Sequence, residues 1–270
     1  MSPTLSPDDD PHRLPRRPAW RGWFRRSAGM ILLLLLGPGA MLAFGGLDLE
    51  THWSQASRAS TGQAPDPATT PEPLVLVYGA RAHNWRGAFA IHTWIATKRA
   101  QAAHYTLHQV LGWNLAWGQS VVSTRQGVPD ARWYNAMPEL LLERRGPTVE
   151  ALIDRIEAAV AAYPYPRDYH VWPGPNSNTF TAFVARQVPE LGLDLPPTAL
   201  GKDYLTDCCF LAPTPSGTGW QVSLAGLLGL SLAREEGIEL NVLGLAVGMD
   251  LNDLSLRLPG IGRLPLVERG

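Results

Sequence analysis

One stretch of the chain, Ser27–Leu47, contains no charged residue and includes the aliphatic run Met30–Leu36. About 20 consecutive apolar residues are enough for a helix to cross the hydrocarbon core of a bilayer. Residues 1–26 precede this stretch and carry six arginines against three aspartates. Arginines beside a membrane helix favour the cytoplasmic side. The sequence therefore predicts a cytoplasmic Arg-rich N-terminus (1–26), a transmembrane anchor or signal (27–47) and an exported remainder.

Two interpretations of this stretch stay open. Gly37-Pro38-Gly39 interrupts the aliphatic run and is expected to weaken or kink a helix there. Ala43-Phe44-Gly45 is an acceptable small-x-small cleavage site, so a cleaved signal peptide is the alternative to an uncleaved anchor. With an uncleaved anchor we expect a single-pass protein of the inner membrane whose C-terminal domain lies in the periplasm.

The charge balance and the cysteines exclude several classes of protein. The formal net charge of the 270 residues is −1, so no basic excess exists to neutralise phosphates, and we expect no nucleic-acid partner. The only cysteines, Cys208 and Cys209, are adjacent, which disfavours an ordinary disulfide and offers no zinc-ribbon spacing. No spacing typical of a metal site or of a phosphate-binding loop is present, and we expect neither a metal nor a cofactor.

The exported part divides into a linker and a folded domain. Residues 48–73 are rich in Pro, Thr, Ala and Ser, which predicts a flexible linker. A globular domain is expected over 74–270. Its strands are predicted where apolar or alternating runs lie between turn signals, at Leu74–Tyr78, Ala88–Thr97 and Tyr105–Trp113, and less strongly at Val121–Thr124 and Glu139–Glu143.

Helices and a C-terminal hairpin complete the expected fold. Thr148–Tyr163 has an apolar stripe and ends before Pro164, and Asn178–Arg186 is a second predicted helix. Near the C-terminus, Trp220–Leu224 and Ile238–Val242 alternate, which favours a hairpin, although Leu224–Leu232 is apolar enough for a second membrane helix. The sequence thus predicts an α+β fold with a mainly antiparallel sheet and two or three helices, preceded by one N-terminal membrane helix.

The segment Trp172–Phe180 is the strongest candidate for chemistry. Its Pro and Gly residues force a turn, and Ser177 or Asn178 then lies where a helix begins. A nucleophile at this position benefits from the helix dipole and from free N–H groups that stabilise an oxyanion. His92, in mid-strand, is the leading candidate for the base. In the alternative interpretation, His92 is a core residue and Asn176 and Ser177 only cap the helix.

Three segments resemble a bacterial family described as domain of unknown function 3750: Ala88–Ala96, Tyr163–Phe180 and the tail from Gly237 to Leu264. This resemblance implies a cell-envelope protein and assigns no activity. A more distant resemblance is to permuted papain-like proteins, such as NlpC-type peptidases and lecithin retinol acyltransferase-like enzymes. It rests on His92 and on Asn176–Phe180, and Ser177 stands where that superfamily has its cysteine.

The papain-like resemblance implies roles for individual residues. Ser177 is the expected nucleophile, His92 the general base and His104 or His108 its orienting partner, with Asn176 beside the nucleophile. Expected substrate-binding residues are Asn178, Trp94, Trp172 and His83, although tryptophans are mostly core residues. The implied function is a Ser/His hydrolase or acyltransferase acting on an amide or ester bond of peptidoglycan, lipoprotein or lipid. The alternative is an inactive binding or structural envelope protein of the same fold.

Overall fold

The computed structural model describes residues 19–206 and 210–266, so the first arginines and the pair Cys208 and Cys209 lie outside the described residues. The first helix, α1 (Ala19–Phe44), continues through Pro38. Within it, Arg26–Phe44 is long and apolar enough to cross a membrane, with a mean hydropathy of 2.0. The chain divides after Leu33 into two compact units, and the second unit runs from Leu34 to the C-terminus.

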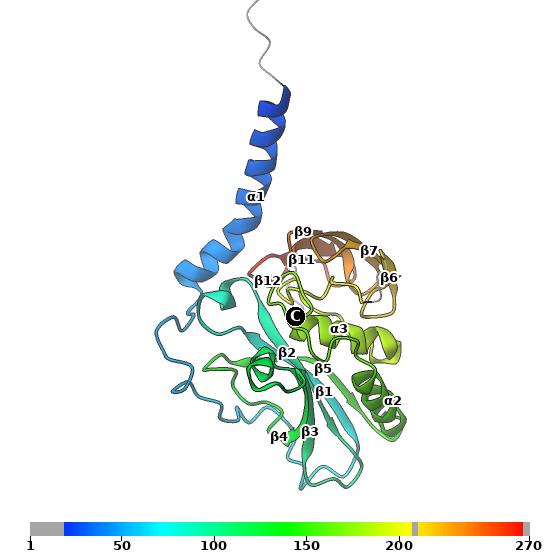
Figure 1. Ribbon diagram of the computed structural model, residues 1–270. Helices are drawn as coiled ribbons and strands as arrows, with labels where there is room; N and C mark the ends of the chain where they lie inside the picture. Colours follow the sequence, from blue (N-terminus) through cyan, green and yellow to red (C-terminus); the bar gives the residue numbers. More distant parts are fainter. Residues whose placement is uncertain (1–18, 207–209, 267–270) are drawn as a thin grey trace, which may run out of the picture. The chain divides into compact units, whose positions relative to one another are not determined.

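The first half of this second unit is built on a five-stranded antiparallel sheet. Its strands lie in the order β4-β3-β2-β1-β5 (Figure 1). The bounds are β1 (Leu74–Arg81), β2 (Ile91–Lys98), β3 (Tyr105–Val110), β4 (Val122–Gly127) and β5 (Pro138–Arg145). All five overlap predicted strands, although the second was predicted to begin at Ala88, which instead ends a 3-10 helix, η1 (Asn84–Ala88). The end of the third predicted strand instead forms a short 3-10 helix, η2 (Gly112–Trp117).

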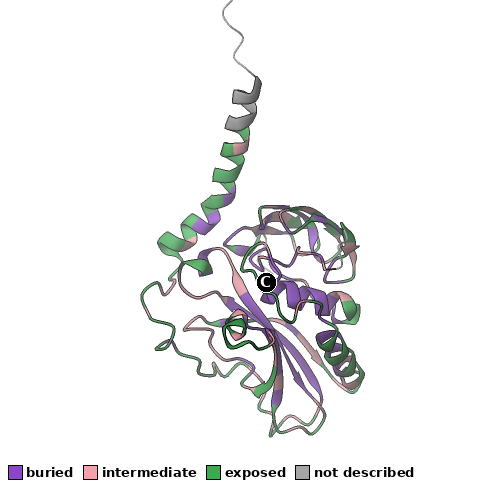
Figure 2. Cartoon of the chain, viewed as in Figure 1, coloured by how far each residue is buried: buried purple, intermediate pink, exposed green. Residues whose placement is uncertain are grey.

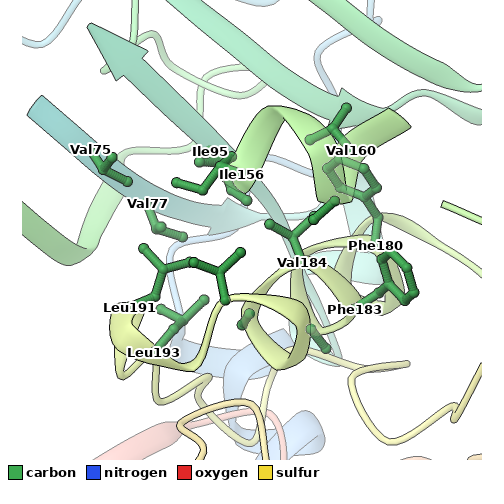
Figure 3. Close-up of a cluster of buried hydrophobic side chains, with 14 of the residues drawn as sticks. Val75, Val77, Ile95, Ile156, Val160, Phe180, Phe183, Val184, Leu191 and Leu193 are labelled. Carbon is green, nitrogen blue, oxygen red and sulfur yellow. The ribbon is translucent and has the colours of Figure 1, made fainter. Parts of the chain in front are cut away.

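Two helices, α2 (Val149–Ala161) and α3 (Ser177–Gln187), cover one face of this sheet. Val77 and Ile95 from the strands pack with Ile156 and Phe180 from the helices in one buried cluster (Figure 3). Helix α3 is buried over most of its length (Figure 2). Burial on this scale stabilises the domain mainly through the hydrophobic effect.

The opposite face of the sheet is covered by irregular chain. Tyr78 and Trp94 are buried there, and Trp133 packs against them. Asp130 holds residues 60–64 to the domain through the Ser60 hydroxyl and the Gln63 N–H. Residues 48–73, predicted as a flexible linker, therefore lie in the same compact unit as the sheet. Both faces of the central strands are consequently buried, which explains why their apolar runs are nearly continuous.

The second half is a seven-stranded antiparallel meander in which each strand pairs with the next. It comprises β6 (Leu211–Pro213), β7 (Gly219–Leu224), β8 (Leu228–Ala233), β9 (Gly237–Val242), β10 (Leu245–Asp250), β11 (Ser255–Leu258) and β12 (Gly262–Pro265). The predicted strands at Trp220–Leu224 and Ile238–Val242 are present, but β8 lies between them. Leu224–Leu232 is therefore the end of β7, a turn and most of β8, and the alternative of a second membrane helix is wrong.

The polarity of this meander is inverted. Its buried face carries polar and charged side chains, including Glu239 and Arg257. The other face, called the outer face below, consists of cross-strand rows of apolar residues that are exposed or half-buried. The rows are Pro213, Trp220, Leu232, Ile238, Met249, Leu256 and Leu264; Leu211, Val222, Leu230, Leu240 and Val247; and Leu224, Leu228, Val242 and Leu245.

An ion cluster joins the buried face of the meander to the loop after α3. Arg257 is fully buried and donates to both carboxylate oxygens of Asp194, at 2.8 and 2.9 Å, and to Glu239 at 2.8 Å. Lys202 bonds Asp203 and also Glu239. Since buried charges must be paired, this cluster fixes the meander against the loop after α3.

Candidate functional site

A cavity of about 1010 Å³ lies where β2 and β3 separate. The two strands pair from Thr97 and Thr106 only as far as Ile95 and His108. Beyond that point His92 on β2 and Gln109 on β3 both line the cavity. The start of α3 contributes Asn176, Ser177 and Asn178 to the wall. The structure thus brings three of the predicted catalytic residues, His92, Asn176 and Ser177, to one cavity.

Asn176 caps helix α3. Its side-chain oxygen accepts hydrogen bonds from the N–H groups of Asn178 and Thr179, at 2.9 and 3.1 Å. Its own N–H donates to the Thr179 hydroxyl, which completes a capping box. The Asn176 amide also donates to the carbonyls of Val171 and Leu200. Asn176 therefore fixes where the helix begins.

Asn178 fastens the helix to the sheet. Its amide donates to the carbonyls of Ile91 and Leu200, and its oxygen accepts from the Thr93 hydroxyl at 3.0 Å. Gly201 lies behind the cap with φ +100°, and a Cβ there would meet the Asn176 side chain. These contacts hold the start of α3 rigidly beside β2.

Ser177 and His92 approach the cavity from different sides of β2. The Thr93 side chain points to α3, and side chains alternate along a strand, so the neighbouring His92 points to the opposite face. No hydrogen bond joins His92 to Ser177 among the described residues. Within the same part of the chain, the Ser177 hydroxyl has no hydrogen-bond partner, although the residue is nearly buried.

His92 is held by Gln109 and Trp133. Its Nε2 lies 3.0 Å from Gln109 Oε1, and because an amide oxygen only accepts, this nitrogen carries the proton. Its ring stacks on Trp133 with 3.6 Å between centroids, and Trp133 stacks in turn on Trp113. Burial lowers the pKa of His92 to about 4. The imidazole is consequently neutral at pH 7 and a weak base.

The two histidines expected to orient His92 lie elsewhere. His104 is exposed in the loop before β3, beyond the far end of β2. Lys98, at that end, is six positions along the strand from His92, a distance of about 20 Å. His108 is buried between Thr97 and Thr124, and burial lowers its pKa to about 4. The structure gives Gln109 the position next to His92.

The expected substrate-binding residues are also divided. His83 and Asn178 line the cavity. Trp94 is buried and donates its indole N–H to the Pro129 carbonyl. Trp172 is half-exposed and donates to the Leu243 carbonyl at the turn after β9. Neither tryptophan lies in the cavity wall, because Trp94 packs in the sheet's second core and Trp172 bridges to the meander.

Sequence reasoning missed most of the cavity wall. Aromatic residues from η2 and from the irregular chain after β4 form one side: Trp113, Trp117, Trp133 and Tyr134. Arg58, Arg86 and Arg125 line the same cavity, and its described wall contains no aspartate or glutamate. The Arg58 guanidinium lies over the Tyr134 ring at 4.4 Å from the centroid. The one sequence feature that could have indicated this wall is the adjacent aromatic pair Trp133 and Tyr134 inside an irregular segment.

Residues 72–204 match the model of a family described as protein of unknown function (DUF3750). This match confirms the family resemblance for the segments Ala88–Ala96 and Tyr163–Phe180, whereas the tail from Gly237 to Leu264 lies outside the matched residues. It covers the five-stranded sheet, α2 and α3, and it ends before the meander. All cavity residues except Trp53 and Arg58 lie inside it. No curated protein and no solved structure matches the chain, and the papain-like relation stays a prediction.

Proposed function

Starting from a domain that matches a family without an assigned activity, we propose that this protein binds a small anionic molecule with an aromatic or apolar body. The binding site is the cavity at the separated ends of β2 and β3. One observation carries the proposal: the cavity combines a stacked aromatic wall with three arginines and no described carboxylate. A volume of about 1010 Å³ is enough for a drug-sized ligand.

The aromatic wall supplies the surface for the body of the ligand. His92, Trp133 and Trp113 form a continuous stack, and Trp113 is half-exposed. Such rings bind flat apolar groups through area burial and offset stacking. The fixed pairing of His92 with Gln109 keeps the stack in one orientation, so the wall is preformed.

The charge around the cavity selects the anionic group. Arg58 and Arg86 are exposed at the cavity, and guanidinium groups favour carboxylate and phosphate ligands. The N-terminal end of α3, with Ser177, adds the positive end of a helix dipole to the same wall. A neutral analogue of the ligand loses these interactions and keeps only the stacking.

Equilibrium dialysis of the full chain in lipid nanodiscs tests the proposal with 2-naphthoate and its neutral analogue 2-naphthamide. Naphthoate is expected to bind about tenfold more tightly, corresponding to about 1.4 kcal/mol. The variant Arg58→Gln/Arg86→Gln is expected to reduce this difference several-fold, since Arg125 and the N-terminal end of α3 remain. Trp133→Ala weakens both ligands, and Arg155→Gln on α2 serves as the surface control. Equal binding of the two probes to the wild type, or no effect of the Trp133 variant, contradicts the proposal.

Hydrolysis or acyl transfer by Ser177 is the second candidate function. It is favoured by the position of Ser177 at the first turn of α3, facing a cavity that also contains His92. Attack by the serine requires a base that takes the proton of its hydroxyl. That base is either His92, after it moves closer to Ser177, or a basic group of the substrate. Labelling of the full chain with a fluorophosphonate tests this function. Labelling that disappears in Ser177→Ala supports it, and no labelling of the wild type contradicts it.

For location we propose an inner-membrane anchor with residues 48–270 in the periplasm. The arginines that precede the apolar part of α1 support this orientation. A periplasm-active reporter fused after Gly270 is expected to be active, and a cytoplasm-active reporter at the same position to be inactive. The reverse pattern would place the cavity in the cytoplasm.

A further inference from the structure

We propose that the outer face of the seven-stranded meander rests on the lipid bilayer as a second membrane contact of this chain. The proposal is independent of the cavity and of its ligand. It starts from the inverted polarity of the sheet: Glu239 and Arg257 point inward, whereas Val222, Leu230 and Leu240 point outward.

The chemistry of the outer face favours lipid over protein as the partner. Its rows contain no charged residue and, apart from the Trp220 indole, no side-chain hydrogen-bonding group. Protein interfaces carry about one hydrogen bond per 100–200 Å² and a polar rim. A face that stays apolar across all seven strands, over about 29 Å, matches hydrocarbon better than another folded surface.

The turn at one end of the meander also contacts the candidate membrane helix. The part of α1 from Leu34 onward belongs to the same compact unit as the meander. Leu34, Gly37 and Pro38 are buried on one side of α1, where a Cβ on Gly37 would meet the Pro259 carbonyl in the turn between β11 and β12. Arg81 fixes that turn by donating to the carbonyls of Gly260 and Ile261. The part of this apolar helix from Leu34 onward thus contacts the turn at one end of the meander.

Nitroxide labels on the full chain in phosphatidylcholine vesicles test the proposal. Cys208 and Cys209 are first replaced by serine, and single labels are placed at Leu230→Cys on the outer face and at Ala158→Cys on the exposed side of α2. At Leu230, collisions with oxygen are expected to be frequent and collisions with a water-soluble nickel complex several-fold rarer than at Ala158. A label at Leu240→Cys repeats the measurement, and unchanged thermal unfolding shows that each variant is folded.

Two results overturn the proposal. Equal nickel accessibility at Leu230 and Ala158 would place the outer face in water. Shielding of Leu230 from both oxygen and nickel, with spin–spin broadening that disappears on dilution with unlabelled chain, would make a second copy of the chain the partner.

Discussion

The two sheets of this protein differ in which of their faces are apolar and which are covered by other parts of the chain. In the five-stranded sheet, Val77 and Ile95 point to the helices and Tyr78 and Trp94 to irregular chain, so both faces are apolar and covered. In the meander, the covered face is polar and the apolar face is outside. The comparison shows that alternation in a strand gives the period of burial but not its direction, which depends on what lies on each side.

The largest expected effect comes from the inward charges of the meander. Glu239→Gln leaves Arg257 and Lys202 facing an amide, and removal of one partner of a buried ion pair costs about 3–5 kcal/mol. Glu235→Gln, in an exposed turn of the same sheet, is the matched control and is expected to change stability by less than about 0.5 kcal/mol. Urea unfolding of the full chain in nanodiscs measures both. An unchanged free energy of unfolding in Glu239→Gln would mean that the stability of the buried face does not depend on its charges.

The next largest expected effect is a difference in the free energy of unfolding between two apolar truncations, one in the core under the five-stranded sheet and one on the outer face of the meander. Ile156→Ala, in the core under the five-stranded sheet, is expected to lower the free energy of unfolding by about 2–5 kcal/mol. Leu230→Ala removes an exposed side chain of the outer face. In detergent it is expected to lower the free energy of unfolding by less than about 1 kcal/mol. Similar losses for the two variants under those conditions would show that the outer face is packed inside the protein.

The third expected effect, smaller for each residue, is a dependence of stability on pH that originates in the five-stranded sheet. Burial lowers the pKa of His92 and of His108 to about 4, whereas an unfolded histidine titrates near 6.5. The unfolded state then binds more protons, so stability is complete above pH 6.5 and falls as the pH drops toward 4. Between pH 7 and 5 the loss is about 2 kcal/mol for each histidine.

Unfolding of His92→Gln/His108→Gln at the two pH values checks this prediction. The double variant is expected to lose the part of the pH dependence that the histidines cause. The meander sequence contains no histidine, so the effect originates in the first sheet. A double variant with the same slope as the wild type would mean that neither imidazole is held neutral.

The first sheet was more predictable from the sequence than the second. Leu74–Tyr78 and Thr148–Tyr163 have strong local patterns, and they appear as β1 and α2 with small shifts at their ends. In the meander, β11 and β12 have only four residues each, and β8 (Leu228–Ala233) alternates with its apolar residues outward. The polar partners that bury the other face, such as Asp194 and Lys202, are distant in sequence and gave no local signal.

In the candidate site, too, contacts between residues that are distant in sequence could not be predicted. His92 and Asn176–Asn178 could each be predicted from a local signature, a strand histidine and a turn followed by a helix cap, but these signatures do not show that the two segments share a cavity. The residue that holds His92, Gln109, lies on the next strand beyond the point where pairing stops. Arg58 reaches the cavity from a segment without periodicity. Contacts of this kind depend on where two strands separate, which composition and periodicity do not encode.

Photo-crosslinking of the full chain to vesicles that contain a diazirine-bearing phospholipid tests the contrast between the sheets most directly. After irradiation, the crosslinked peptides are identified by mass spectrometry. The account predicts crosslinks on α1 and on the outward residues of β7 to β9, such as Val222 and Leu240, and none on the exposed side of α2. Crosslinks confined to α1, or found equally on α2, would contradict the assignment of the meander's apolar face to lipid.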